Sequence, residues 1–232
     1  MSQIIHLIIS IIFLNSSVFA QELYIFYPNN MRPQIFQKKM GDVSPNLKIT
    51  AFGRYKDFIA QIEMSNPEAI ITKQVLIEEI ENYSIKLEGS RDGANTEPYV
   101  LLAVDKQLDL KAIQDKQIGM LDILGRKGMK KFITNFFDPP PKLQRVSKIE
   151  DLLPLLTFDM AQGILIPEAY ISYFKNISNL NFIVTQLPKV KVEIVCLAIK
   201  KGADPTIFVQ ALKNMDAKTR MALLEVDNWI EQ

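Results

Sequence analysis

The stretch 108–128, LDLKAIQDKQIGMLDILGRKG, decides the fold of this chain. It follows the apolar run Val100–Val104, holds a second short apolar run at Ile118–Leu121, and then turns through two glycines into a helical pattern. Strand, glycine-bearing turn and helix in this order begin a new α/β unit. Because the same order opens at Glu22–Phe36, the sequence predicts an α/β protein of two similar lobes with a functional cleft between them.

An architectural repeat supports this division. Residues 47–80 and 142–174 both run as strand, helix, short apolar strand, turn and helix, which predicts parallel sheets with right-handed crossovers. The alternative is that any α/β chain repeats such units without being duplicated. We expect a first lobe of residues 21–102 plus 192–232, a second lobe of residues 103–191, and two crossing segments that join them.

Local signals set the expected helix ends. Ser147 and Glu150 have the spacing of a capping box, which predicts a helix spanning roughly Lys148–Leu156. Asp216 is the expected N-cap of a terminal helix that presents Trp229, and this tryptophan is a candidate surface for a partner.

The first twenty residues have the pattern of a secretory signal. The apolar run Ile4–Leu14 has the length of a signal-peptide core and is too short to span a bilayer, and Val18–Ala20 is a small-x-small cleavage site. We expect residues 1–20 to be a signal peptide cleaved after Ala20, which implies export across the inner membrane. The alternative is an N-terminal membrane anchor.

Composition excludes several classes of function. The 27 basic and 26 acidic residues nearly balance, so the basic excess of a nucleic-acid-binding protein is absent. The one histidine, His6, lies in the expected signal peptide, which removes Ser-His-Asp, Cys-His and His-ligated metal sites from the mature chain. Cys196 lies in an apolar strand pattern and is expected to be a buried, inert thiol. We therefore expect no enzyme, no cofactor and no metal.

Three segments carry a resemblance to a known family. They are the restart Asp109–Asp122, the strand and helix start Gly163–Glu168, and the late run Cys196–Pro205. In their order and spacing, over Leu23–Leu224, the chain resembles the type 2 periplasmic solute-binding proteins, and within them the phosphate/phosphonate-binding branch.

The resemblance implies two Rossmann-like lobes joined by two crossing segments. It also implies a monomeric periplasmic protein that captures a small anionic solute between its lobes for an inner-membrane permease of an ABC transporter. At one place the chain departs from the branch, because a hydroxyl-rich turn of that branch corresponds here to Ile123–Gly128, which has no hydroxyl. The alternative function is therefore a sensor or accessory module of the same fold that docks on a signalling receptor or envelope complex, with weak or no solute binding.

Candidate ligand-binding residues follow from the fold, because open α/β sheets bind ligands beyond the carboxyl ends of their strands. Arg54 directly follows a strand and can clamp a carboxylate or phosphate, whereas Arg91 and Glu97 can either line the cleft floor or form a surface ion pair. The candidates are Tyr27, Asn29, Asn30, Arg54, Thr72, Lys73, Arg91, Gly125, Arg126 and Lys127.

Overall fold

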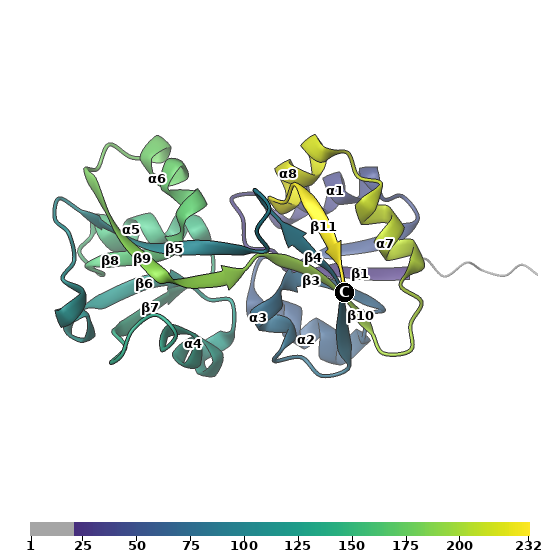
Figure 1. Ribbon diagram of the computed structural model, residues 1–232, viewed down its shortest axis with the longest axis horizontal. Coiled ribbons are helices and arrows are strands. Elements are labelled where there is room, and N and C mark those ends of the chain that lie inside the picture. Colours follow the sequence, from purple (N-terminus) through teal and green to yellow (C-terminus); the bar gives the residue numbers. More distant parts are fainter. Residues whose placement is uncertain (1–20) are drawn as a thin grey trace, which may run out of the picture.

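Two β-sheets, each with helices on both faces, form two lobes side by side (Figure 1). The computed structural model describes residues 21–232, so the expected signal peptide lies outside the described residues. Within that range no helix combines the length and the apolar character needed to cross a bilayer. The mixed α/β fold with two lobes, predicted from the sequence, is confirmed.

The first lobe contains a six-stranded sheet in the order β11-β4-β10-β3-β1-β2. β1 pairs in parallel with β2 and β3, as the strand and helix alternation predicts, and β10, β4 and β11 extend the sheet by antiparallel pairing. The strands are β1 (Gln21–Ile25), β2 (Leu47–Ala51), β3 (Ala69–Lys73), β4 (Tyr83–Ser90), β10 (Val195–Lys200) and β11 (Asn228–Glu231).

Side chains of β1 alternate between the two faces of this sheet. Tyr24 belongs to the apolar cluster that contains Phe58 of α2 (Tyr55–Ser65), whereas Leu23 and Ile25 belong to the cluster that contains Phe36 of α1 (Pro33–Val43). This alternation, with a period of two residues, is what lets one strand bury both of its faces. The helices of the lobe are α1 (Pro33–Val43), α2 (Tyr55–Ser65), α3 (Gln74–Ile77), α7 (Thr206–Lys213) and α8 (Ala217–Leu224).

The second lobe contains a five-stranded sheet in the order β7-β6-β8-β5-β9. β6 is parallel to β7 and β8, and β5 is antiparallel to β8 and β9. Its strands are β5 (Thr96–Val104), β6 (Gln117–Leu121), β7 (Lys142–Val146), β8 (Gly163–Pro167) and β9 (Phe182–Glu193). The lobe boundary expected between residues 102 and 103 falls inside β5, which pairs within this sheet, so the chain crosses between lobes at residues 91–95 and again at residue 194.

A glycine in β6 allows close packing in the second lobe. A Cβ atom on Gly119 would lie 2.7 Å from Cδ1 of Leu155 in α5 (Leu152–Thr157) and 3.0 Å from Cγ2 of Ile164 in β8. Only the bare backbone of glycine therefore fits beneath α5. The helices of the lobe are α4 (Gly125–Ile133), α5 (Leu152–Thr157) and α6 (Ile171–Ile177), with the short 3-10 turns η1 (Leu110–Asp115), η2 (Ile149–Asp151) and η3 (Glu168–Tyr170).

One apolar cluster continues from the first lobe into the second. It joins Phe58 and Leu76 of the first lobe to Met120, Phe132 and Leu165 of the second. Separate clusters fill the opposite faces of the two sheets, with α1, α7 and α8 in the first lobe and α5 and α6 in the second. The two lobes therefore share one apolar core on the side of α2, α3 and α4.

Two expected helix features are wrong. Lys148, and not Ser147, is the N-cap before η2, and within the described chain no side chain caps this end, so the capping box does not form. The terminal helix α8, which has Asp216 as its N-cap as predicted, ends at Leu224. Trp229 lies in β11 and is 6% exposed, because β11 joins the edge of the first sheet and turns the indole into the core instead of toward a partner.

The cysteine lies where its sequence pattern predicts. Cys196 is buried in β10, and its thiol lies 3.4 Å from the carbonyl oxygen of Thr72. Burial raises the pKa of this thiol well above its usual value, so the reactive thiolate is suppressed at neutral pH.

We expect the substitution Phe58→Ala to destabilise the chain far more than Met64→Ala, although both residues lie on α2. Phe58 is 0% exposed and Met64 is 75% exposed. Removing a fully buried ring leaves a cavity that costs about 3–5 kcal/mol, whereas an exposed substitution stays within about 0.5 kcal/mol. Urea denaturation measures both values, and equal losses would show that α2 does not pack as described.

Candidate functional site

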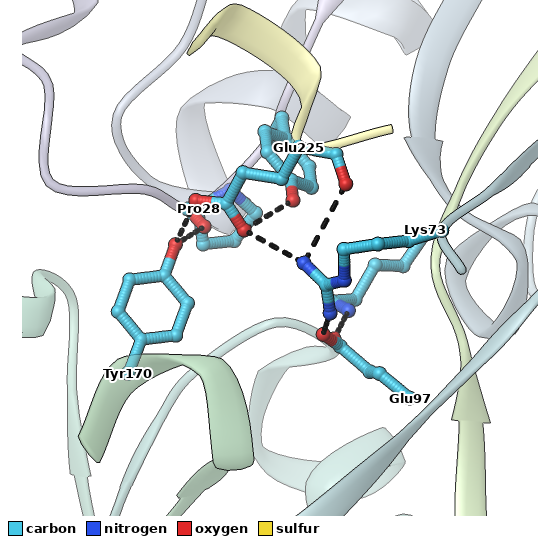
Figure 2. A network of polar contacts seen from close by, with 7 residues as sticks. Pro28, Lys73, Glu97, Tyr170 and Glu225 are labelled. Atoms are coloured by element: carbon cyan, nitrogen blue, oxygen red, sulfur yellow. Dashed lines mark hydrogen bonds and ion pairs between the residues drawn. The ribbon is translucent and has the colours of Figure 1, made fainter. Parts of the chain in front are cut away.

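A buried carboxylate pairs with two cations where the chain crosses between the lobes. Lys73, the last residue of β3, is 5% exposed, and Glu97, near the start of β5, is 3% exposed. Nζ of Lys73 lies 2.5 Å from Oε1 of Glu97, and Nη2 of Arg91 lies 2.8 Å from Oε2 of the same carboxylate (Figure 2). Glu97 therefore uses both oxygens to neutralise cations from the first lobe and from the crossing segment.

The charges and burial of Lys73, Arg91 and Glu97 determine whether the two basic side chains are protonated. Burial is the largest single influence on the pKa of Lys73 and lowers it, but the charge and hydrogen bond of Glu97, with Tyr99 and Glu225, together raise that pKa above its usual value. Burial also lowers the pKa of Arg91, and the charge and hydrogen bond of Glu97 raise it, so that the net result is a raised pKa. Nζ of Lys73 lies 6.0 Å from the ring centroid of Tyr99, where burial raises the phenol pKa to about 12. At neutral pH both cations are therefore charged and already paired within the protein.

A second carboxylate, that of Glu225, lies close to the first. Its Oε2 accepts a hydrogen bond of 2.9 Å from the hydroxyl of Tyr27, and its Oε1 lies 2.9 Å from the hydroxyl of Tyr170. The Tyr170 hydroxyl also lies 3.2 Å from the carbonyl oxygen of Pro28, and Nη1 of Arg91 lies 3.7 Å from Oε2 of Glu225 (Figure 2). Burial, followed by the charge of Glu225, raises the pKa of both tyrosines, which keeps them protonated as donors.

These groups leave little space at the centre of the junction. The central cavity, which Tyr27, Lys73, Glu97, Tyr99 and Tyr170 border, has a volume of about 30 Å³. That volume has room for about two water molecules and is far below the roughly 300–1,000 Å³ of a small-ligand pocket. In this conformation the protein itself fills the centre.

A larger cleft opens beside this centre, between the loops that follow β1 and β2 and the segment that follows β7. Its volume is about 580 Å³, and both lobes line it. We call it the outer cleft. Its lining includes Tyr27, Asn29, Asn30, Arg32, Arg54, Asp57, Leu121, Ser147, Lys148 and Glu150.

Three basic residues of the outer cleft occupy equivalent local positions. Arg32 is the N-cap of α1, Arg54 is the N-cap of α2, and Lys148 is the N-cap of η2. Within residues 21–232 none of these three N-caps contributes a side-chain hydrogen bond to its helix end. Free amides at the N-terminus of a helix and nearby cations both favour an anion, so the outer cleft is electrostatically suited to one.

Acidic residues balance part of this charge. Nε of Arg54 lies 3.0 Å from Oδ2 of Asp57, and both side chains are at least half exposed. Among the side chains that the structure describes, Arg32 and Lys148 take part in no ion pair. An exposed pair such as Arg54 with Asp57 is weak, so the guanidinium stays available to a solute.

The candidate residues predicted from the sequence divide into three groups. Tyr27, Asn29, Asn30 and Arg54 line the outer cleft. Lys73 and Arg91 pair with Glu97, in an ion pair that is buried and not on the surface, and Thr72 is buried in β3. The third group, Gly125, Arg126 and Lys127, begins α4 and lines neither the outer cleft nor the central cavity.

Gly125 has a structural reason to be glycine. Its φ is +68°, and a Cβ atom there would lie 2.6 Å from Cε1 of Tyr55 at the start of α2. A side chain at this position would therefore be strained and would also clash with the other lobe. Arg126 and Lys127 are exposed on α4.

Sequence reasoning missed Arg32, Lys148 and Glu225. A signal existed for Arg32, because it precedes Pro33, and proline at the first position of a helix marks the preceding residue as the N-cap. Lys148 was missed because the capping-box pattern indicated Ser147 as the N-cap. No local pattern pointed to Glu225, because the fold of the C-terminal segment brings it to Tyr170.

We expect Glu97→Gln to lower the free energy of unfolding by about 3–5 kcal/mol, because it leaves the buried Lys73 ammonium without its counter-ion. The double variant Lys73→Met/Glu97→Gln removes that orphan charge and should recover much of the loss. Asp42→Asn is the matched control, since it breaks the exposed pair with Lys38 and should cost less than about 1 kcal/mol. Urea denaturation of the variants measures these differences, and equal losses for Glu97→Gln and Asp42→Asn would contradict the buried pair.

Comparison with known proteins rests on structure. No protein-family model matches the sequence, and no curated protein matches it. A putative L-cystine ABC transporter protein from Listeria monocytogenes is 11% identical with a TM-score of 0.62, covering 90% of this chain and 98% of its own. The VFT2 domain of Bordetella pertussis BvgS, as a double mutant, is 11% identical with a TM-score of 0.58, covering 88% of this chain and 92% of its own.

A third similar structure is the amino acid ABC transporter substrate-binding protein AbpA from Streptococcus pneumoniae, bound to L-arginine. It is 12% identical with a TM-score of 0.54, covering 88% of this chain and 89% of its own. At such identities the likeness concerns the fold alone. The two lobes, the two crossings and these structural neighbours together show that the chain has the type 2 periplasmic-binding-protein fold.

Proposed function

We propose that this protein is a periplasmic solute-binding protein that captures a small anionic solute in the outer cleft and presents it to an inner-membrane ABC permease. The observation that carries the proposal is the convergence of Arg32, Arg54 and Lys148 on one cleft of about 580 Å³. Pockets for small ligands have volumes of roughly 300–1,000 Å³, so this cleft has a suitable size.

The location of the cleft supports capture between lobes. Arg32 and Arg54 belong to the first lobe and Lys148 to the second. An anion held by all three therefore favours the closed arrangement over an open one, because only the closed form offers both sets of cations. A ligand shifts a conformational equilibrium through such a difference in affinity.

The charges around the cleft suggest which solutes to test first. Asp57 and Glu150 lie on the same cleft as the three basic residues. A zwitterion, with a carboxylate toward the cations and an ammonium toward these acids, pairs with both signs of charge. L-cystine, which is in the name of one structural neighbour, and L-arginine, which is bound to another, have this chemistry. Phosphonates and sulfonates are the second class, because they match the cations alone.

We expect a cognate solute to raise the melting temperature, since binding to the native state alone stabilises it. At a hundredfold excess over the dissociation constant the rise should be roughly 5–10 °C. Thermal-shift screens with amino acids, dicarboxylates, phosphonates, sulfonates and phosphate measure it. The absence of a shift with all of these classes would contradict the proposal.

Matched variants then test the site. Arg54→Gln and Lys148→Gln should each weaken binding by about tenfold or more, because each removes a charged hydrogen-bond donor. Lys38→Gln is the control, since Lys38 is exposed on α1 and does not line the cleft. Equal affinities for Arg54→Gln, Lys148→Gln and Lys38→Gln would exclude the outer cleft as the site.

The filled centre of the junction favours a second candidate function, that of a sensor or accessory module docking on a signalling receptor or envelope complex. Glu97 and Glu225 supply carboxylates that a solute would otherwise bring. A protein closed by its own side chains can be read by a partner without solute. Copurification from membranes distinguishes the two functions. A permease that copurifies with the chain supports the transport function, and a sensor protein that copurifies with it supports the signalling function.

A further inference from the structure

The side chain of Glu225 lies between the lobes and contacts both of them. From the first lobe it accepts a hydrogen bond from Tyr27, and the Tyr170 hydroxyl of the second lobe lies 2.9 Å from its other oxygen. Nη1 of Arg91, on the crossing segment, lies 3.7 Å from Oε2 of Glu225. We propose that Tyr27, Arg91 and Tyr170 form an interlobe carboxylate-binding site and that Glu225 is its tethered ligand, which closes the lobes without a bound solute.

The donors around Glu225 are those that a free carboxylate would need. An ionised carboxylate only accepts hydrogen bonds, and here each of its oxygens has a phenol hydroxyl at 2.9 Å. The nearby guanidinium adds a positive charge from the hinge side. The two phenols and the guanidinium come from three separate parts of the chain, and each has an atom within 3.7 Å of this one carboxylate.

The backbone at Glu225 is unusual for a residue with a side chain. Its φ is +57° and its ψ is 32°, the left-handed conformation that closes α8, with its N–H donating to the carbonyl oxygen of Met221. Glycine or asparagine is the common residue at such a helix end. A glutamate here accepts backbone strain, and the contacts of its carboxylate offset that strain.

The segment that follows Glu225 is anchored to the crossing. Oδ2 of Asp227 accepts a hydrogen bond of 2.7 Å from the backbone of Asp92, and the N–H of Asp227 donates to the carbonyl oxygen of Ser90 at 2.8 Å. Glu225 is thereby held against the first lobe and the crossing, whatever the position of the second lobe. The contact with Tyr170 is the part of this site that joins Glu225 to the second lobe.

Glu97 does not perform the same task. It lies directly after the crossing at residues 91–95, and its partners Lys73 and Arg91 belong to the first lobe and to the crossing itself. A rotation of the lobes about the crossing moves such residues little, whereas it separates Tyr170 of η3 from Glu225. We therefore expect the contact between Glu225 and Tyr170 to distinguish closed from open forms.

The test removes the tethered carboxylate and supplies a free one. Glu225→Gly suits the left-handed backbone, so the helix end is retained while the side chain is lost. Propionate has the shape and charge of the missing group, and propionamide has the shape without the charge. We expect propionate to raise the melting temperature of Glu225→Gly in a saturable manner, and neither compound to have this effect on the wild type.

Two further measurements sharpen the test. The double variant Glu225→Gly/Tyr170→Phe should lose the response to propionate. Small-angle X-ray scattering should show a larger radius of gyration for Glu225→Gly than for the wild type, with recovery in propionate. Lys131→Gln is the control, because it breaks an exposed ion pair between Lys131 and Glu79 of the two lobes and leaves the carboxylate site intact.

The outcomes are separable. A specific response of Glu225→Gly to propionate that requires Tyr170 establishes the tethered ligand. Equal responses to propionate and propionamide, or no response together with an unchanged radius of gyration, overturn it. Tyr27 borders both sites, whereas Arg54 lines only the outer cleft. Arg54→Gln should therefore leave the propionate response intact, which separates this result from the solute proposed for the outer cleft.

Discussion

The hinge between the two lobes depends on one buried carboxylate, that of Glu97. A buried ammonium such as that of Lys73 is costly unless an opposite charge and hydrogen bonds accompany it. Glu97 meets this need and at the same time fixes Arg91 on the crossing segment. The end of β3, the start of β5 and the turn between β4 and β5 are therefore held in one geometry. Any rotation of the lobes has to proceed around this fixed point.

Around that point the junction has three parts with different chemistry. On the side of α2, α3 and α4 the lobes share apolar core. On the side of α8 and η3 they meet through hydroxyls and the carboxylate of Glu225. The outer cleft lies where β1, β2 and β7 end, and it is open to solvent and lined by both signs of charge. The apolar packing between the lobes, their polar contact through Glu225 and the cleft that is open to solvent therefore lie on separate sides of the same interface.

The sequence predicted the fold more completely than the site. Alternating apolar runs and helical patterns identified two α/β lobes and the parallel strands, because burial on both faces of a strand leaves a clear pattern. Strand ends also led to Arg54 and Lys73, and the expected crossing segment led to Arg91. The pairing of Lys73 and Arg91 with Glu97 depends on how β3 and β5 approach each other. The spacing of residues along the chain does not indicate such a contact. For the same reason Trp229 was expected on a helix surface, although β11 places it in the core.

The apolar cluster shared by the lobes has a consequence for how the protein denatures. Phe58 and Leu76 on one side and Phe132 and Leu165 on the other exclude water from a single continuous volume. Exposing the half that belongs to one lobe would wet the half that belongs to the other, so neither lobe has an independent core on this side. Heat or denaturant should therefore melt both lobes in one cooperative transition, in spite of their bilobal outline.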